Sequence, residues 1–333
     1  MEISTLEWAI TIGVTVAVLV FDVVVIARNP HEPSFRETAT ALTVYVGAAV
    51  LFGAWIWFEH GHDMGVQFYA GWLTEYSLSI DNLFVFIILM AALRVPREYQ
   101  QEALMVGIIL ALVFRGIFIA LGYQLIANFS WVFYLFGAFL VYTAVSLVKS
   151  YRSHEDEHPE NNRVVRFAQN HLNVGEEYRG LKLFWKENGS RVVSPMLIVI
   201  IALGTTDLLF ALDSIPAIFG ITQEPYLVFT ANVFALMGLR QLYFLLGGLL
   251  KRLIYLSLGL SFILAFIGVK LVLHALHSNE LPFINGGEPV AWAPEISTWL
   301  SLGVIVAAMT IATVASLVKM RRDGRRAHGG ALE

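Results

Sequence analysis

The chain has 333 residues, of which 57% are hydrophobic and 14% are charged, and its formal net charge is −4. This composition is too apolar for an ordinary soluble domain, and the small negative charge argues against nucleic-acid binding. The absence of cysteine excludes disulfides, thiolate metal ligands and thiol chemistry. The apolar residues form runs of about 20 or more without strand-like alternation, which predicts membrane-spanning helices rather than a β-barrel.

Nine spans are predicted. They lie at 6–27, 37–58, 67–92, 102–125, 130–148, 194–219, 226–250, 252–276 and 297–318. The first run lacks the basic segment and cleavage site of a removable signal peptide, so we expect it to be retained as a span. With the N-terminus outside, 19 of the 22 Lys and Arg residues fall on the cytoplasmic side. We therefore predict a multi-pass protein of the plasma (inner) membrane, with its N-terminus outside and its C-terminus in the cytoplasm.

The halves of the chain resemble each other. Residues 75–82 read Glu-Tyr-Ser-Leu-Ser-Ile-Asp-Asn, and residues 207–214 read Asp-Leu-Leu-Phe-Ala-Leu-Asp-Ser. Both have two acids separated by five residues and then a small polar residue. The following span carries a lone arginine in each half, Arg115 and Arg240. Since the two acidic spans would cross the bilayer in opposite directions, we predict an all-α fold with an inverted three-helix repeat, spans 3–5 and 6–8.

This repeat organises the predicted chain. The parts are accessory spans 1 and 2 (1–66), the first repeat (67–148), a cytoplasmic loop (149–193), the second repeat (194–276), and an outer loop with span 9 and a basic tail (277–333). Near the end of the loop, Asn188-Gly189 separates two short mixed runs, which predicts a β-hairpin. The loop is also where a protein partner could bind.

Charged residues inside membrane spans usually mark a functional cavity or pair with each other. The predicted set contains five acids and three bases, namely Asp22, Glu75, Asp81, Asp207, Asp213, Arg115, Arg240 and Lys270. Their formal sum of −2 equals the charge that one divalent cation, or two protons, would neutralise. An alternative is that the acids and bases pair only to hold helices together. For the arginines, a structural counter-charge is the favoured interpretation, and Asp22 could act as a further ligand or pair with Lys270.

Helix geometry places constraints on the acids. Six helical residues rise ~9 Å and turn ~600°, so the two acids of one straight helix cannot face one ion. Inverted symmetry predicts Glu75 level with Asp213, and Asp81 level with Asp207, as two steps along a path. A helix break at Pro216 could release the carbonyl group of Leu212 as a ligand.

The ligand chemistry favours oxygen. Carboxylates, amides, hydroxyls and carbonyls suit Mn²⁺, Ca²⁺ and Mg²⁺ better than Cu⁺ or Zn²⁺. The sequence has no Walker loop, no nucleophile–base pair and no HExxH motif, so neither an enzyme nor a bound cofactor is expected.

These motifs resemble the TerC family of integral membrane proteins, including its Alx branch. The resemblance rests on residues 75–86, 136–140, 207–218, 239–244 and 266–270. It implies manganese export, with calcium handling in some members and a link to alkaline-pH or tellurite phenotypes. It further implies an ion site at Glu75, Asp81, Asn82, Asp207, Asp213 and Ser214.

The sequence departs from the family pattern at three positions. Tyr76 and Ser146 stand where relatives often have lysine, and Gly204 stands where the Alx branch often has an acid. Losing two buried positive charges should make the cavity more negative.

The resulting hypothesis is a secondary transporter that exports a divalent metal, Mn²⁺ first and Ca²⁺ second, in exchange for protons. Its expected partners are the metal ion, protons and the lipid bilayer, without nucleic acid. Two alternatives are a membrane metal sensor or scaffold acting through the 149–193 loop, and a cation channel.

Overall fold

The computed structural model describes residues 3–28, 33–153, 174–175, 178, 182–187, 190–246, 255–290 and 292–329. Within that part the protein is almost entirely helical. The elements are α1 (Thr5–Arg28), α2 (Phe35–Glu59), α3 (His62–Ala92), α4 (Arg97–Asn128), α5 (Val132–Ser153), β1 (Phe184–Glu187), β2 (Ser190–Val193), α7 (Pro195–Phe219), α8 (Pro225–Met237), α9 (Leu239–Leu246), α10 (Leu256–His277), the 3₁₀ turn η3 (Asn285–Gly287) and α11 (Thr298–Gly329).

The helices match the predicted spans in number and place. Among the described residues, eight helical stretches are long and apolar enough to cross a membrane, and α1 adds a shorter apolar stretch, Thr5–Phe21. The seventh span is divided into α8 and α9, which meet at Gly238. Helix α11 continues past the predicted end of span 9 into the basic tail, as far as Gly329.

Local sequence signals set the helix starts. The Ser34 hydroxyl accepts a hydrogen bond from the backbone N–H of Glu37 at 3.2 Å, which caps α2. The Ser194 hydroxyl does the same for Met196 at 3.1 Å, and Pro195 occupies the first turn of α7, where its missing N–H costs nothing. Gly61 precedes α3 with φ 103°, a backbone conformation that residues with a Cβ rarely adopt.

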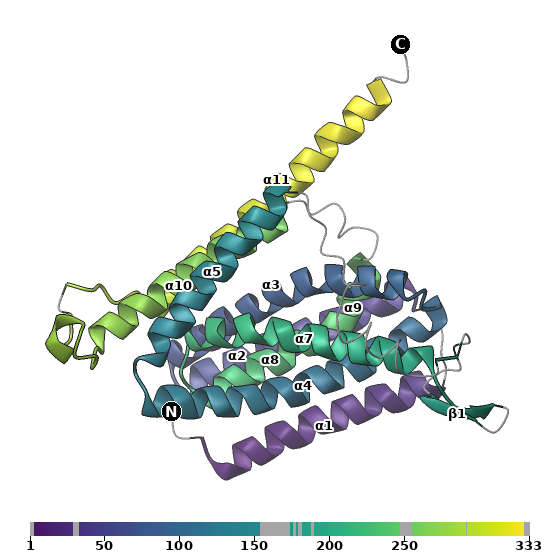
Figure 1. The fold of residues 1–333 in the computed structure, drawn as a ribbon, viewed down its shortest axis with the longest axis horizontal. Helices are drawn as coiled ribbons and strands as arrows, with labels where there is room; N and C mark the ends of the chain where they lie inside the picture. The colour runs from purple at the N-terminus through teal and green to yellow at the C-terminus, as the bar shows by residue number, and fades with distance from the viewer. Residues whose placement is uncertain are drawn as a thin grey trace.

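The helices form two groups (Figure 1). One is a bundle of α1–α4 and α7–α9, and the other is a layer in which α5, α10 and α11 lie side by side. Glycines bring α5 and α10 together: a Cβ on Gly137 would lie 2.7 Å from the carbonyl oxygen of Gly268, and one on Gly268 would lie 2.8 Å from that of Gly137. Such close backbone approach at small residues is typical of membrane helix pairs.

Two apolar clusters fill the bundle. The first core cluster takes in residues 68–78 of α3, 119–126 of α4 and 211–219 of α7, and the second takes in residues 83–90 of α3, 103–111 of α4 and 196–203 of α7. The early part of α3 thus lies with the late part of α7, so these two helices are antiparallel, as the charge pattern predicts.

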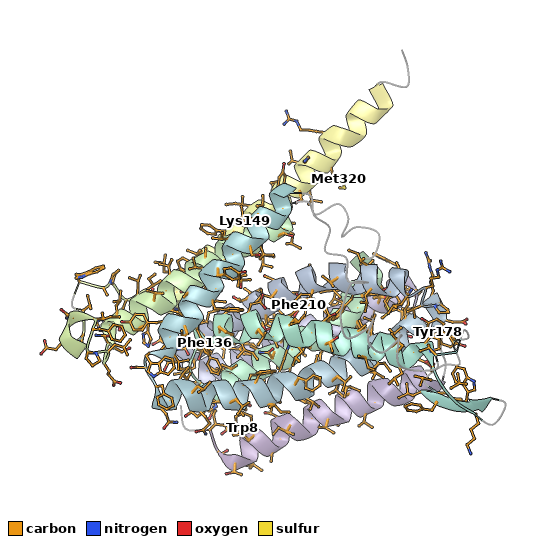
Figure 2. The ribbon with its side chains drawn as sticks, viewed as in Figure 1. Trp8, Phe136, Lys149, Tyr178, Phe210 and Met320 are labelled. Carbon is orange, nitrogen blue, oxygen red and sulfur yellow. The ribbon has the colours of Figure 1, made fainter. Side chains whose placement is uncertain are left out.

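The predicted hairpin is present. Strands β1 and β2 pair antiparallel with Glu187 opposite Ser190, as a two-residue connection requires. Val174 forms an isolated bridge with Val193. The Tyr178 hydroxyl donates to the backbone carbonyl of Leu93 at 2.7 Å, so the described part of this segment is tied to the α3–α4 turn. Figure 2 shows Tyr178 at the end of the bundle nearest the hairpin.

Candidate functional site

Arg115 of α4 lies inside the bundle and bonds to three other helices. Its Nη1 donates to Oε2 of Glu75 on α3 at 2.6 Å and to Oδ1 of Asn232 on α8 at 2.9 Å. Its Nη2 and Nε donate to the two carboxylate oxygens of Asp207 on α7 at 3.3 and 3.4 Å. The exposed fractions are 1% for Arg115, 0% for Glu75, 2% for Asp207 and 1% for Asn232. The four side chains form one water-excluded polar cluster, named here the Arg115 network.

The Arg115 network lies at the boundary of the two core clusters. Arg115 falls between Ala111 of the second core cluster and Ile119 of the first. Asp207 falls between Leu203 of the second and Ala211 of the first. Apolar side chains therefore close the polar cluster at both ends. An ion bound at this level would be occluded from both sides of the membrane.

The network carries a charge imbalance. If Glu75 and Asp207 are both ionised, their two negative charges and the positive charge of Arg115 sum to one negative charge in a buried site. Burying an uncompensated charge costs several kcal/mol in proteins, so such a site favours uptake of a cation or a proton. Oε1 of Glu75 is buried and has no hydrogen-bond partner among the described residues. This oxygen is a further acceptor available to a ligand.

Asn232 completes the cluster and was not among the predicted site residues. Its Nδ2 donates to the backbone carbonyl of Val228 at 3.1 Å, which turns Oδ1 toward Arg115. Asn232 is uncharged, so a search for charges inside the spans does not find it. Comparison of the two halves does not find it either, because Asn232 precedes Arg240 at the same distance at which Gly107 precedes Arg115. A buried amide in the middle of an apolar helix was the signal that could have found it.

The other predicted ligands lie along the same helices. Ser214 is fully buried, and its hydroxyl has no partner among the described residues. Asn82 is buried on α3, and Asp213 is half-buried on α7. The side chains of Asp22 and Asp81 fall outside the described part of the structure. The three described residues are not bonded to Arg115.

The predicted two-level arrangement of the acids is wrong. Glu75 and Asp207 were expected ~9 Å apart along the membrane normal, yet both bond to the guanidinium of Arg115. A sequence correspondence between two helices does not set the height at which they cross. In the structure the side chains of Glu75 and Asp207 meet at Arg115. Asp213 then lies ~9 Å away on the side of the first core cluster, and the backbone of Asp81 ~9 Å away toward the second.

The expected break at Pro216 is also absent. Helix α7 continues through Pro216 to Phe219. Pro216 has no N–H to donate to the carbonyl of Leu212, so one backbone bond is missing there, but the helix continues for three more residues. The break in this half of the protein falls at Gly238, where a Cβ would lie 3.3 Å from the hydroxyl of Tyr76.

The remaining basic residues lie in different places. Arg240 is buried on α9. The Nζ of Lys270 donates to Oγ of Ser301 on α11 at 3.1 Å, so its described partner is a hydroxyl. Lys270 also lines a cavity of about 480 Å³ where α7 ends and α3 and α11 begin. Its polar lining residues are Gln67, Thr222, Gln223, Glu224, Lys270, His274, Glu295, Ser297 and Thr298.

The donor set of the network is made of oxygen atoms. Two carboxylates and one amide oxygen suit hard divalent cations such as Mn²⁺, Ca²⁺ and Mg²⁺. In the described part of the chain no three His, Asp or Glu residues come together as a ready metal site. Glu75 and Asp207 are the only two acids that share Arg115 in that part, and the guanidinium stands between them.

Comparisons with known proteins give a consistent assignment. The sequence profile described as "Integral membrane protein TerC family" matches residues 60–324. An uncharacterized membrane protein of Mycobacterium tuberculosis is 45% identical over 329 residues, covering 98% of this chain and 83% of that protein.

More distant relatives extend the match. An uncharacterized membrane protein of Myxococcus xanthus is 37% identical, covering 94% of this chain and 92% of its own length. A protein of Photorhabdus laumondii named putative membrane-bound redox modulator Alx is 36% identical, covering 81% and 87%. No solved structure gives a significant match. The chain is a multi-pass integral membrane protein, and it belongs to the TerC family.

Proposed function

We propose that this protein is a secondary transporter that exports a divalent cation, with Mn²⁺ as the first candidate and Ca²⁺ as the second, in exchange for protons. The observation that carries the proposal is the Arg115 network. Two buried carboxylates face a single bonded arginine, and apolar side chains enclose this cluster at both ends, so that it would carry an excess negative charge with both carboxylates ionised.

The order of the acids along α3 and α7 supports a path rather than a single cage. Glu75 and Asp207 form the central level, with Asp213 ~9 Å to one side and Asp81 ~9 Å to the other. A cation would move from one acidic level to the next while the apolar clusters open in turn. With the N-terminus outside, as the basic residues suggest, Asp81 is the level nearer the cytoplasm and Asp213 the level nearer the outside.

Proton exchange follows from the same chemistry. A carboxylate that loses its bound cation in a buried site regains neutrality most easily by taking a proton. Glu75 has a spare buried oxygen for that proton. Thiol redox chemistry is excluded for this chain because it has no cysteine, so the redox term in the name of the Alx relatives cannot refer to a thiol mechanism here.

The test is transport by the purified full-length protein in proteoliposomes. Mn²⁺, Ca²⁺, Mg²⁺ and Zn²⁺ are supplied one at a time, at two pH values, with a pH-sensitive dye trapped inside. We expect saturable Mn²⁺ flux with opposite proton movement. Downhill flux that neither saturates nor moves protons would indicate a channel instead, and absence of flux for all four metals would refute transport.

Variants connect the activity to the site. Glu75→Gln and Asp207→Asn should each lower Mn²⁺ flux at least tenfold, because each removes a charge from the central level. Glu98→Gln is the matched control, since Glu98 is an exposed acid in the first turn of α4. If the site variants transport as well as the control, the Arg115 network is not the cation site.

A further inference from the structure

The Arg115 guanidinium is surrounded by oxygen atoms as a bound metal ion would be. The atoms are Oε2 of Glu75, both carboxylate oxygens of Asp207 and Oδ1 of Asn232, at 2.6 to 3.4 Å from its nitrogens. They come from α3, α7 and α8, while the arginine comes from α4. All these oxygens converge on one positive charge.

The atoms that face the guanidinium are all hydrogen-bond acceptors. The Asn232 amide donates from Nδ2 to the backbone of Val228 and turns its oxygen toward Arg115, while its second N–H is directed to the Glu75 carboxylate. Oε1 of Glu75 remains without a partner in the described structure. A hard divalent cation takes six or more oxygen ligands at ~2.0–2.6 Å. With Oε1 of Glu75 the cage supplies five oxygens, so such an ion would need at least one further ligand, such as a water molecule, and closure of the helices by ~1 Å.

We propose that Arg115 is a tethered cation, which fills the transport site of Glu75, Asp207 and Asn232 when no metal is bound and is displaced when a metal enters. This inference rests on the proposed function and deepens it, because it assigns Asn232 as a ligand and makes Arg115 a competitor of the metal. A purely structural counter-charge would instead hold the carboxylates in place for the metal.

The two roles predict opposite effects on metal binding. If Arg115 competes, removing its charge makes metal binding tighter. If Arg115 only positions the carboxylates, removing it makes binding weaker. A competitor also keeps the empty site partly neutral, so its loss should slow turnover even though affinity rises.

The experiment measures Mn²⁺ binding to the purified full-length protein in detergent, from the loss of the free-ion electron paramagnetic resonance signal. Arg115→Gln should lower the Kd at least tenfold relative to the wild type, and Mn²⁺ flux in proteoliposomes should fall. Arg115→Lys, which keeps the charge, should stay within about threefold of the wild-type Kd. Arg36→Gln, at an exposed arginine of α2, is the matched control and should change nothing. A Kd for Arg115→Gln equal to or above the wild-type value overturns the proposal.

A second comparison guards against misfolding. Arg115→Gln leaves two buried carboxylates without their counter-charge, so the same change is also made together with Glu75→Gln, which retains the wild-type formal charge of the site. The double variant should bind Mn²⁺ at least fivefold more tightly than Glu75→Gln alone. Equal or weaker binding by the double variant overturns the competitor role.

The ligand role of Asn232 has its own readout. Asn232→Asp should tighten Mn²⁺ binding and Asn232→Ala should weaken it, each by at least fivefold, and equal affinities would remove Asn232 from the cage. Failure of the proposed function looks different from failure of this inference. If the wild type neither binds nor transports any metal of the panel, the proposed function fails. If the wild type transports but Arg115→Gln binds no more tightly, only the tethered cation fails.

Discussion

Replacing Arg115 with methionine should destabilise the protein strongly, and the structure sets the size of the effect. The change leaves Glu75 and Asp207 in a site where both are almost fully buried, without the guanidinium that bonds to both. Removing one partner of a buried ion pair costs about 3–5 kcal/mol. We expect a loss in this range for Arg115→Met at neutral pH.

Replacing the carboxylates as well should restore much of the loss. In the triple variant Glu75→Leu, Arg115→Met, Asp207→Leu no charge remains to be buried, and exchanging a buried ion cluster for apolar side chains is often neutral or stabilising by about 1–4 kcal/mol. The Oδ1 of Asn232 would lose its donor, at a cost of about 1–3 kcal/mol. The triple variant should therefore lie near the wild type in stability but transport nothing.

The assay is equilibrium unfolding in mixed detergent micelles with increasing sodium dodecyl sulfate, followed by the fluorescence of the 8 tryptophans. Arg36→Met serves as the control for losing an exposed arginine. If the triple variant is no more stable than Arg115→Met, the uncompensated carboxylates are not the cause of the loss. The view of the network as a set of mutually dependent charges would then be refuted.

Two further predictions follow from the packing. Gly137→Val should lower the free energy of unfolding by about 1–3 kcal/mol in the same assay, because its Cβ would lie 2.7 Å from the carbonyl oxygen of Gly268. The control Gly303→Val should change it little, since a Cβ there has nothing within 4 Å. Equal effects of the two variants would contradict the contact between α5 and α10. Burial raises the pKa of Tyr178 from 10.0 to about 12, so its contribution to stability should fall as pH rises between these values. Tyr178→Phe, which loses the bond to Leu93, should make the fall of stability with pH shallower and speed proteolysis of the loop. An unchanged pH profile would contradict this role of Tyr178.

Much of the fold could be predicted because a membrane imposes simple rules. Apolar runs long enough to cross the bilayer must be helices, since every backbone group needs an internal partner there. This rule located α7 to within a residue of its observed bounds, Pro195–Phe219. The Asn188-Gly189 pair gave the hairpin for an equally local reason. The interruption at Gly238 was missed because a single glycine inside an apolar run does not by itself mark the end of a helix.

The candidate site was predicted in part. Charges in apolar spans are rare enough to stand out, so Glu75, Arg115 and Asp207 were found from sequence, and the structure brings them together. Their relative levels were not found, because sequence correspondence between two helices does not set the height at which they cross. Asn232 was missed because it is uncharged. The inverted repeat itself stays a prediction, as does the identity of the ion.

The position of the Arg115 network has a mechanical consequence. Apolar helix faces in a bilayer gain little from associating, because lipid is equally apolar, so tight packing and polar bonds hold membrane bundles together. Here the Arg115 network joins four helices at one level, between two apolar clusters that share the same helices. A transporter must open one cluster while the other stays closed. If the protein works as proposed, the bonds from Arg115 to α3, α7 and α8 would join the moving parts at the level where both movements meet. A cation that displaced Arg115 would take over those bonds with its own ligands, so loading the site and releasing the helices from the arginine would be a single event.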